Sequence, residues 1–309
     1  MAAPKRVVPV LVGPTAVGKT AVAVGLAEHW PGLTVISADA RQVYRGLDIG
    51  TAKASAAVQA QLPHRGIDLV DPGERYSAGQ FARDAAQWLA QVGDRPVIVV
   101  GGTGFYVRAL ADGLFREPAM PPASRTAMRG WLNRVESIAR WAARLDPAYQ
   151  GGGGRQRAQR AVEVALITGR PLSWWQEHAR AEGVVAPWYI RLTLPRAVLH
   201  KRIAERVHAM LEGGFVAEVE RVLAAGVGVA ADAPGLDGVG YREVVRHLAG
   251  ELSAAALPDA IQQATRRYAK RQETWFRHQL TGDVLTLDAT GTPEALAATI
   301  AARFPRGAS

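Results

Sequence analysis

The sequence predicts an α/β protein with a parallel β-sheet and a helical segment inserted into it. Apolar runs alternate with helical patterns over the first third of the 309 residues, as in βαβ units. The strand pattern stops near Glu117, where prolines cluster, and a helical pattern continues from Ser124 to about Ala181. An apolar strand returns at Trp188. These changes divide the chain into a core, residues 1–116 and 189–309, and a helical insertion, residues 117–188.

The elements follow from apolar periodicity and from breaks at Gly and Pro. The expected strands are residues 7–12, 33–37, 67–70, 96–100, 188–194 and 284–287. The expected helices of the core are residues 19–28, 78–92, a segment after Gly104, 196–211, 215–225, 241–248, 258–279 and a surface helix after Thr290. Pro9 is unusual in the first strand because it has no N–H to donate to the sheet. Ser77 with Gln80 forms a capping box that opens the helix ending near residue 92.

Composition limits the class of protein. Hydrophobic residues make up 48% and charged residues 21%, which is typical of a globular protein. The chain has 37 Lys and Arg against 28 Asp and Glu, a net charge of +9. This excess indicates a polyanionic partner such as nucleic acid, or reflects an Arg-rich genome; composition alone favours neither.

Several kinds of chemistry and location are excluded or disfavoured. The chain has no cysteine, so it has no disulfide, thiolate zinc site or thiol nucleophile. No apolar run approaches the ~18 residues of a membrane span, and no signal peptide is visible. A soluble, cytoplasmic protein is the expectation.

One motif follows the first strand directly and opens the first helix. It fits the pattern G-x-x-x-x-G-K-[ST] and consists of Gly13, Pro14, Thr15, Ala16, Val17, Gly18, Lys19 and Thr20. The two glycines let backbone N–H groups turn towards an anion, and the helix N-terminus adds partial positive charge. Lys19 supplies a full charge, and the Thr20 hydroxyl can ligate Mg²⁺. The strand–loop–helix context favours a P-loop NTPase-like core over a chance glycine-rich turn.

The acidic residue of an ordinary P-loop NTPase is missing from its usual place. Such proteins carry an apolar strand that ends in Asp and helps to hold magnesium, whereas the run at residues 97–100 ends in glycines. Asp39 instead follows the second strand, and Thr103 follows the fourth. Both are expected near the phosphate loop, because ligands bind at the carboxyl ends of parallel strands. Asp39 could accept a proton from a nucleophile. It could also cap a helix or replace the missing magnesium ligand.

These residues and others of the chain together resemble the tRNA dimethylallyltransferase family, also called tRNA isopentenyltransferases. The shared motifs run from residue 13 to residue 277, and the phosphate loop, D-I-G-T-A-K and G-G-T are the most specific of them. The motifs are Gly13–Thr20, Ser37–Asp39, Val43-Tyr44, Asp48–Lys53, His64-Arg65, Ile67-Asp68, Tyr76-Ser77, Gly101–Thr103, Gln156-Arg157, Arg202, Arg206, Val239–Arg242, Lys270–Gln272 and Trp275.

The resemblance implies that a dimethylallyl group moves from dimethylallyl diphosphate to N6 of adenosine 37 in tRNAs reading codons that begin with U. The phosphate loop then holds the diphosphate, with Mg²⁺ on Thr20. The resemblance also assigns Arg206, four residues after Arg202, to the diphosphate. The adenine amine is a poor nucleophile and needs proton removal, a role that suits Asp39. Thr103 would orient the amine or the diphosphate.

The family also reads the anticodon stem-loop, whose target base must be flipped out of its stack. By position, the tRNA-contacting residues are Asp39, Ala40, Arg41, Gln42, Thr103, Arg125, Gln156, Arg157, Ala158, Gln159 and Arg160. Two features depart from the family pattern: Arg41 and Gln42 stand where small or apolar residues are frequent, and Gly151–Gly154 replaces a segment that often contains Asn-Asp.

The long basic helix admits two interpretations. Its cationic residues either follow the tRNA backbone or are simply solvated, with Tyr268 and Trp275 facing the core. For the whole chain, two other functions remain open: a small-molecule kinase that uses ATP, and a tRNA-binding protein regulated by nucleotide. A monomer is expected, since one chain carries all the residues of the expected site.

Overall fold

The computed structural model describes residues 5–115, 122–151, 154–179, 182–225 and 233–305. The chain forms two compact units. Residues Met1–Ala111 and Val184–Ser309 form the core unit, and Asp112–Gly183 form the helical unit. The helical unit therefore begins and ends about five residues earlier than the helical insertion expected from the sequence, residues 117–188.

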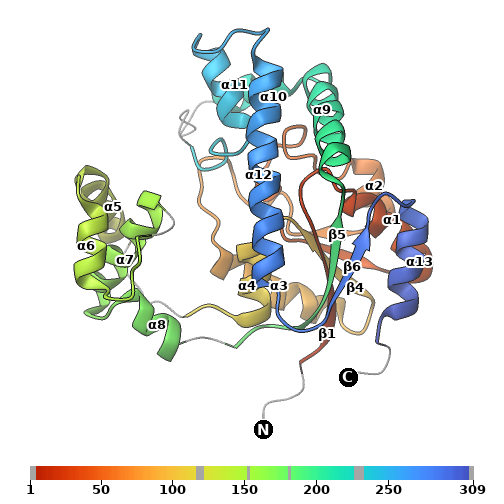
Figure 1. Cartoon of the computed structure of the whole chain (residues 1–309), viewed down its shortest axis with the longest axis horizontal. Coiled ribbons are helices and arrows are strands. Elements are labelled where there is room, and N and C mark those ends of the chain that lie inside the picture. The colour runs from red at the N-terminus through yellow and green to blue at the C-terminus, as the bar shows by residue number, and fades with distance from the viewer. Residues whose placement is uncertain (1–4, 116–121, 152–153, 180–181, 226–232, 306–309) are drawn as a thin grey trace. The chain divides into compact units, whose positions relative to one another are not determined.

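The core unit contains a six-stranded sheet in which all the pairs are parallel, as the sequence predicts (Figure 1). The strand order is β3-β2-β4-β1-β5-β6. The strands are β1 (Val7–Val12), β2 (Thr34–Ser37), β3 (His64–Arg65), β4 (Val97–Gly101), β5 (Ala186–Thr193) and β6 (Val284–Asp288). Pro9 fits into the central strand because pairing of β1 with β4 begins only at Val10.

Helices connect and cover these strands. Those of the core unit are α1 (Lys19–His29), α2 (Ala56–Gln61), α3 (Ala78–Val92), α4 (Gly104–Asp112), α9 (Arg196–Glu212), α10 (Phe215–Ala224), α11 (Tyr241–Leu248), α12 (Leu257–Gln279) and α13 (Pro293–Arg303). The expected cap of α3 is present, because Ser77 Oγ accepts a hydrogen bond from Gln80 N at 3.1 Å. Helix α13 lies along α1, and α12 packs against α9 (Figure 1).

The prediction of a strand at residues 67–70 is wrong. The third strand is β3, at His64–Arg65, and only an isolated bridge joins Tyr44 to Val70. The chain leaves the sheet at Gly66, whose φ is +82° and where a Cβ would lie 2.6 Å from Ser37 O. Asp68, with φ of 53°, continues this turn. Left-handed backbone is incompatible with a regular strand. The apolar residues Ile67, Leu69 and Val70 are thus only partly buried, in a turn and not in a strand.

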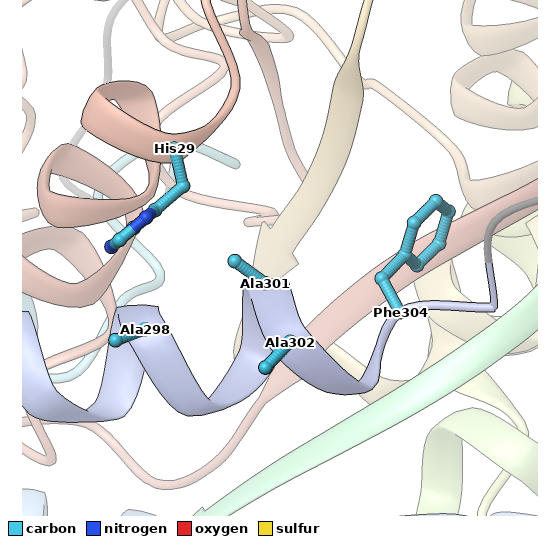
Figure 2. Close-up of a pocket in the computed structure, with 5 residues that line it drawn as sticks. All are labelled: His29, Ala298, Ala301, Ala302 and Phe304. Carbon is cyan, nitrogen blue, oxygen red and sulfur yellow. The ribbon is translucent and has the colours of Figure 1, made fainter.

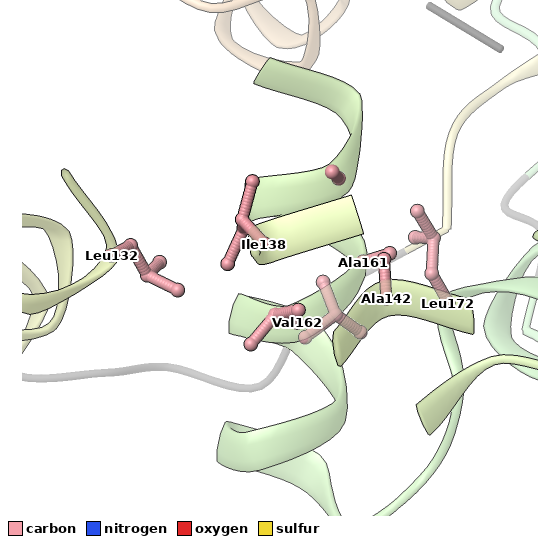
Figure 3. Close-up of a cluster of buried hydrophobic side chains, with 8 residues drawn as sticks. Leu132, Ile138, Ala142, Ala161, Val162 and Leu172 are labelled. Carbon is pink, nitrogen blue, oxygen red and sulfur yellow. The ribbon is translucent and has the colours of Figure 1, made fainter. Parts of the chain in front are cut away.

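The helical unit has its own hydrophobic core (Figure 3). Its helices are α5 (Pro122–Arg134), α6 (Ile138–Leu145), α7 (Gly154–Thr168) and α8 (Leu172–His178). The buried cluster consists of Leu132, Ile138, Ala142, Ala158, Ala161, Val162, Val164 and Leu172. Small residues on one side of α7 allow α6 to pack closely against it. Trp175 packs at the edge of this cluster, which fits a packing role.

In the described part of the chain, no helix is both long and apolar enough to cross a bilayer.

Candidate active site

The phosphate loop joins β1 to α1 at the carboxyl edge of the sheet. Gly13 lies so close to β5 that a Cβ would be 2.8 Å from Leu192 O. Gly18, with φ of +105°, precedes the first residue of α1. Both positions therefore require glycine for steric reasons. The loop is shaped by its neighbours as well as by its own sequence.

Lys19 lies inside this loop, with its ammonium Nζ donating to Gly13 O at 2.9 Å and to Pro14 O at 2.8 Å. Burial lowers the pKa of Lys19 to about 8, the Asp39 carboxylate acts in the opposite direction, and Arg206 lowers the pKa further. Lys19 is thus close enough to both Asp39 and Arg206 for their charges to act on it. Lys19 and Asp39 were expected at the site from the sequence pattern, and Arg206 from the family resemblance.

Two arginines extend from α9 towards the loop. Arg202 donates from Nη1 to Val17 O and from Nη2 to Ala289 O, each at 3.2 Å. Arg202 therefore fixes the backbone of the loop, and a fully solvated basic face does not describe it. Burial lowers the pKa of Arg206. A buried guanidinium beside Lys19 makes this region strongly attractive to an anion.

Asp39 lies in the turn that follows β2. Its Oδ1 accepts hydrogen bonds from Arg41 N at 2.8 Å and from Gln42 N at 3.4 Å. Among the described residues, Oδ2 has no hydrogen-bond partner. The carboxylate thus caps a turn with one oxygen and keeps the other for a second role. The capping alternative and the general-base alternative are compatible in this geometry.

Thr103 follows β4 and lies against the same turn. Its Oγ1 accepts from Ala40 N at 3.0 Å, and its backbone N donates to Ala38 O at 3.2 Å. A Cβ on Gly101 would lie 2.2 Å from Ala38 O, so the chains after β2 and β4 are in direct backbone contact. This contact places Asp39 and Thr103 together at one edge of the sheet, as the sequence predicts.

One face of α12 lies over the site, and sequence reasoning gave it no site role. The Gln272 side chain is 6% exposed, accepts from Thr15 N at 2.8 Å and donates to Gly102 O at 2.9 Å. Burial together with the nearby Asp39 raises the pKa of Tyr268 to about 12, while Arg41 and Thr103 act in the opposite direction. The Trp275 ring packs on Gly104.

The spacing of these residues in the sequence could have predicted that they share one face of the helix. Residues 268, 272 and 275 recur at the helical spacing of four and three, which places them on one face. The Tyr268 and Trp275 side chains turn inward, while Arg267, Lys270, Arg271 and Arg277 are exposed. The aromatic side of α12 therefore faces inward. Contact between its exposed cationic side chains and the tRNA backbone stays a prediction.

Replacing Gln272 by leucine is expected to destabilise the core unit by about 1–3 kcal/mol, because Thr15 N and Gly102 O would lose their buried partner. Urea denaturation measures this free energy of unfolding. The matched control is Gln263→Leu on the exposed face of the same helix, expected to change stability by less than about 0.5 kcal/mol. Equal effects of the two variants would contradict the bridging role.

The side chains near the phosphate loop indicate how a magnesium ion could be bound. Within the described ranges, no group of three or more His, Asp or Glu side chains is arranged to hold a metal. Thr20 offers one exposed hydroxyl in the first turn of α1. Mg²⁺ keeps several waters and binds readily through substrate phosphates with one or two protein ligands. These residues therefore fit an ion that arrives with a diphosphate better than a permanent protein-bound metal.

The residues expected to contact tRNA fall into two groups. In the core unit, Arg41 Nη1 donates to Pro234 O at 2.6 Å, and Gln42 is hydrogen-bonded to Ser37 and to the loop at residues 51–52. Both side chains are held by the protein itself. Ala40, whose N–H binds Thr103, is half-buried beside them.

In the helical unit, Gln156 and Arg157 are exposed on α7. Ala158 is 1% exposed and packs in the core cluster, so its side chain is not on the surface. Gln159 Nε2 donates to Asn133 Oδ1 at 2.9 Å. Arg160 pairs with Glu163 at 2.8 Å. Arg125 lies on α5, and its side chain is outside the described residues.

A separate surface groove lies between the end of α1 and α13 (Figure 2). It is lined by His29, Ala298, Ala301, Ala302 and Phe304. His29 ends α1, whereas Lys19 begins it, so the groove lies at the helix end remote from the phosphate loop. Its alanine-rich lining offers little polar chemistry.

Fold and site together define a class: an α/β protein with a parallel sheet, in which a loop with the G-x-x-x-x-G-K-[ST] pattern opens the first helix, Asp39 follows β2 and β4 ends in glycine. Comparison with known proteins makes this specific. The family described as IPP transferase matches residues 42–279, and the related isopentenyl transferase family matches residues 6–66. The chain belongs to the IPP transferase family.

Individual relatives agree with this assignment. A tRNA dimethylallyltransferase of Xanthomonas campestris is 44% identical over 297 residues, 91% of this chain and 90% of that protein. One from Halorhodospira halophila is 43% identical over 288 residues, 90% of this chain and 92% of that protein.

Solved structures agree as well. The tRNA isopentenylpyrophosphate transferase of Bacillus halodurans has a TM-score of 0.70 at 31% identity and covers 96% of this chain and 95% of its own. A eukaryotic dimethylallyltransferase described as acting on tRNA has a TM-score of 0.74 at 25% identity, over 92% of this chain and 74% of its own. These matches confirm the resemblance and the fold class expected from the sequence.

Proposed function

We propose that this protein transfers the dimethylallyl group of dimethylallyl diphosphate to N6 of adenosine 37 in tRNAs that read codons beginning with U. The bond between the allylic carbon and the diphosphate oxygen breaks, a bond from N6 to that carbon forms, and diphosphate leaves. The proton lost from N6 goes to Asp39 and then to solvent. The observation that carries the proposal is the Lys19 ammonium, which is held in the loop by Gly13 O and Pro14 O and whose charge interacts with both the Asp39 carboxylate and Arg206.

The cradle suits a diphosphate that is also the leaving group. Backbone N–H groups of the loop, Lys19 and Arg206 stabilise the charge that grows on the departing oxygens. A magnesium ion held by the diphosphate and the Thr20 hydroxyl would neutralise part of that charge. Thr103 and Asp39, which are hydrogen-bonded to the same turn, orient and deprotonate the incoming amine.

The alternatives are weaker on specific grounds. A kinase or a nucleotide-regulated protein with this loop normally holds magnesium with an Asp at a strand end, and β4 ends at Gly101. The test incubates the protein with unmodified tRNA and dimethylallyl diphosphate, digests the RNA, and measures nucleoside masses. We expect one adenosine to gain a dimethylallyl group. ATP turnover without that product would identify a kinase, and nucleotide-dependent tRNA affinity alone would identify a regulated binding protein.

The tRNA contacts form part of the proposal. Gln156 and Arg157 are exposed, and Arg and Gln side chains suit base edges and phosphates of an anticodon loop. Gln159 and Arg160 are committed to Asn133 and Glu163, so they support the helical unit at least as much as they bind RNA.

Binding of the donor is expected to depend on pH through Lys19. Its ammonium has a pKa of about 8 and attracts the diphosphate only when protonated, so donor affinity falls as pH rises through about 8. The fall approaches tenfold per pH unit for one linked proton. Donor titrations between about pH 7 and about pH 9.5 measure this.

The matched variant is Lys19→Met, which keeps the length of the side chain and removes the charge. It is expected to bind the donor more weakly and without this pH dependence. A parent affinity that stays flat across the range would contradict the role of Lys19.

A further inference from the structure

Helix α10 contributes a buried acid to a loop about 170 residues earlier in the sequence. Glu218 is 2% exposed. Its Oε2 accepts from Asp48 N at 2.8 Å and Ile49 N at 2.7 Å, and its Oε1 accepts from Gly50 N at 3.2 Å. Tyr241 donates its hydroxyl to Oε1 at 2.7 Å. Successive backbone N–H groups that converge in this way form an anion-binding nest, here filled by a side chain of the protein itself.

The loop held by Glu218 fits its surroundings tightly. A Cβ on Gly50 would lie 2.1 Å from the Phe215 ring and 2.6 Å from the Tyr241 ring. These two rings pack edge to face, with centroids 4.9 Å apart. The Glu218 carboxylate and the two rings therefore fix the position of the loop backbone at residues 48–50.

The same loop supports the turn that carries Asp39. Gln42 Nε2 donates to Thr51 O at 3.2 Å and to Ala52 O at 3.4 Å, while Gln42 Oε1 accepts from Ser37 Oγ at 2.8 Å. The backbone N of Gln42 is one of the two donors to Asp39 Oδ1. Glu218 is thus linked to Asp39 by hydrogen bonds to residues 48–50, by the loop backbone up to residue 52, and by the hydrogen bonds of Gln42.

We propose that Glu218 is a positioning residue for the Asp39 carboxylate in the transfer reaction. The inference rests on the proposed function, in which Asp39 removes the proton from the attacking amine. Glu218 touches no substrate; it acts by holding the loop at residues 48–52, against which the Asp39 turn is placed. A displacement of about 1 Å at a reacting group costs about 100-fold in rate, so this support has kinetic consequences.

The test uses Glu218→Gln, which keeps the size of the side chain and replaces one acceptor oxygen by an NH₂ group facing backbone donors. We expect the single-turnover rate per folded molecule to fall about 10- to 100-fold. Donor affinity should be unchanged, because no hydrogen bond of Glu218 reaches the phosphate loop. The matched control is Glu220→Gln, an exposed acid on the same helix, expected to keep the parent rate.

A purely structural role predicts a different result: lower thermal stability with the parent rate in the fraction that remains folded. A rate within about twofold of the parent would therefore overturn the inference. Tyr241→Phe removes a single hydrogen bond and keeps the carboxylate, so it serves if Glu218→Gln does not fold; it should show a smaller fall in rate. A parent rate for folded Tyr241→Phe would then count against the inference.

A double-mutant cycle separates this inference from the proposed function. If Glu218 acts through Asp39, adding Glu218→Gln to Asp39→Ala should cause no further loss of rate. Full additivity of the two effects would overturn the inference. If the parent protein forms no modified adenosine, the proposed function itself fails, and that result is independent of any Glu218 variant.

Discussion

Replacing Asp39 by alanine is expected to lower the single-turnover rate of transfer by about 10²–10⁴-fold, the usual contribution of a general base. The amine of adenine has little basicity, so its proton must leave as the new bond to carbon forms. Donor binding should survive the change, because a carboxylate near the cradle repels a diphosphate. The measurement is a rapid-quench assay at saturating tRNA and donor, together with a donor titration.

A second substitution separates the two uses of the carboxylate. Asp39→Asn keeps an oxygen able to accept from Arg41 N and Gln42 N, and it cannot take up a proton near neutral pH. If Asp39 is the base, both variants are slow. A near-parent rate for Asp39→Asn would instead make it a turn cap only. A rate for Asp39→Ala that recovers with added Mg²⁺ would favour the metal-ligand alternative.

Replacing Gly101 by alanine is expected to have the second largest effect. A Cβ there would lie 2.2 Å from Ala38 O, and a backbone atom cannot move aside as the end of a side chain can. The ends of β2 and β4 would have to separate, which costs about 1–3 kcal/mol of stability. Asp39 follows Ala38, and Thr103 lies two residues after Gly101, so the same separation should lower the transfer rate by about 100-fold.

Urea denaturation and the single-turnover assay together measure this prediction. The control is Gly79→Ala in the first turn of α3, where the nearest atom to a new Cβ is an Arg83 nitrogen at 3.8 Å. That variant should be neutral or stabilising by up to about 1 kcal/mol. Parent-like stability and rate for Gly101→Ala would contradict the close approach of the two strand ends.

Local sequence patterns predict most of the fold. The phosphate loop, the strand before it and the helix after it are adjacent in the sequence, so the motif predicts the geometry directly. The prediction of a strand at residues 67–70 is wrong, because a short apolar run does not reveal the turn that Gly66 and Asp68 impose. Helix α2 was missed, since it is short and has no buried residue to produce periodicity.

The sequence could predict only those residues of the candidate site that directly follow the ends of strands. Asp39 and Thr103 were found because parallel strands direct their carboxyl ends to one edge. Gln272 and Glu218 were not predicted, because each is hydrogen-bonded to a loop that lies 168 or more residues earlier in the sequence. A helical pattern shows only that such a residue faces inward. Which loop a buried polar side chain holds is a property of tertiary structure.

The order of the sheet has a consequence for synthesis of the protein on the ribosome. Strand β1 is made first, yet it lies between β4 and β5, and β5 begins only at Ala186. The phosphate loop that follows β1 also depends on Gln272 of α12. A nascent chain that has exposed only its N-terminal half therefore lacks part of the support of this loop, and such long-range pairing slows assembly. Under the proposed function, truncated translation products should be unable to bind dimethylallyl diphosphate.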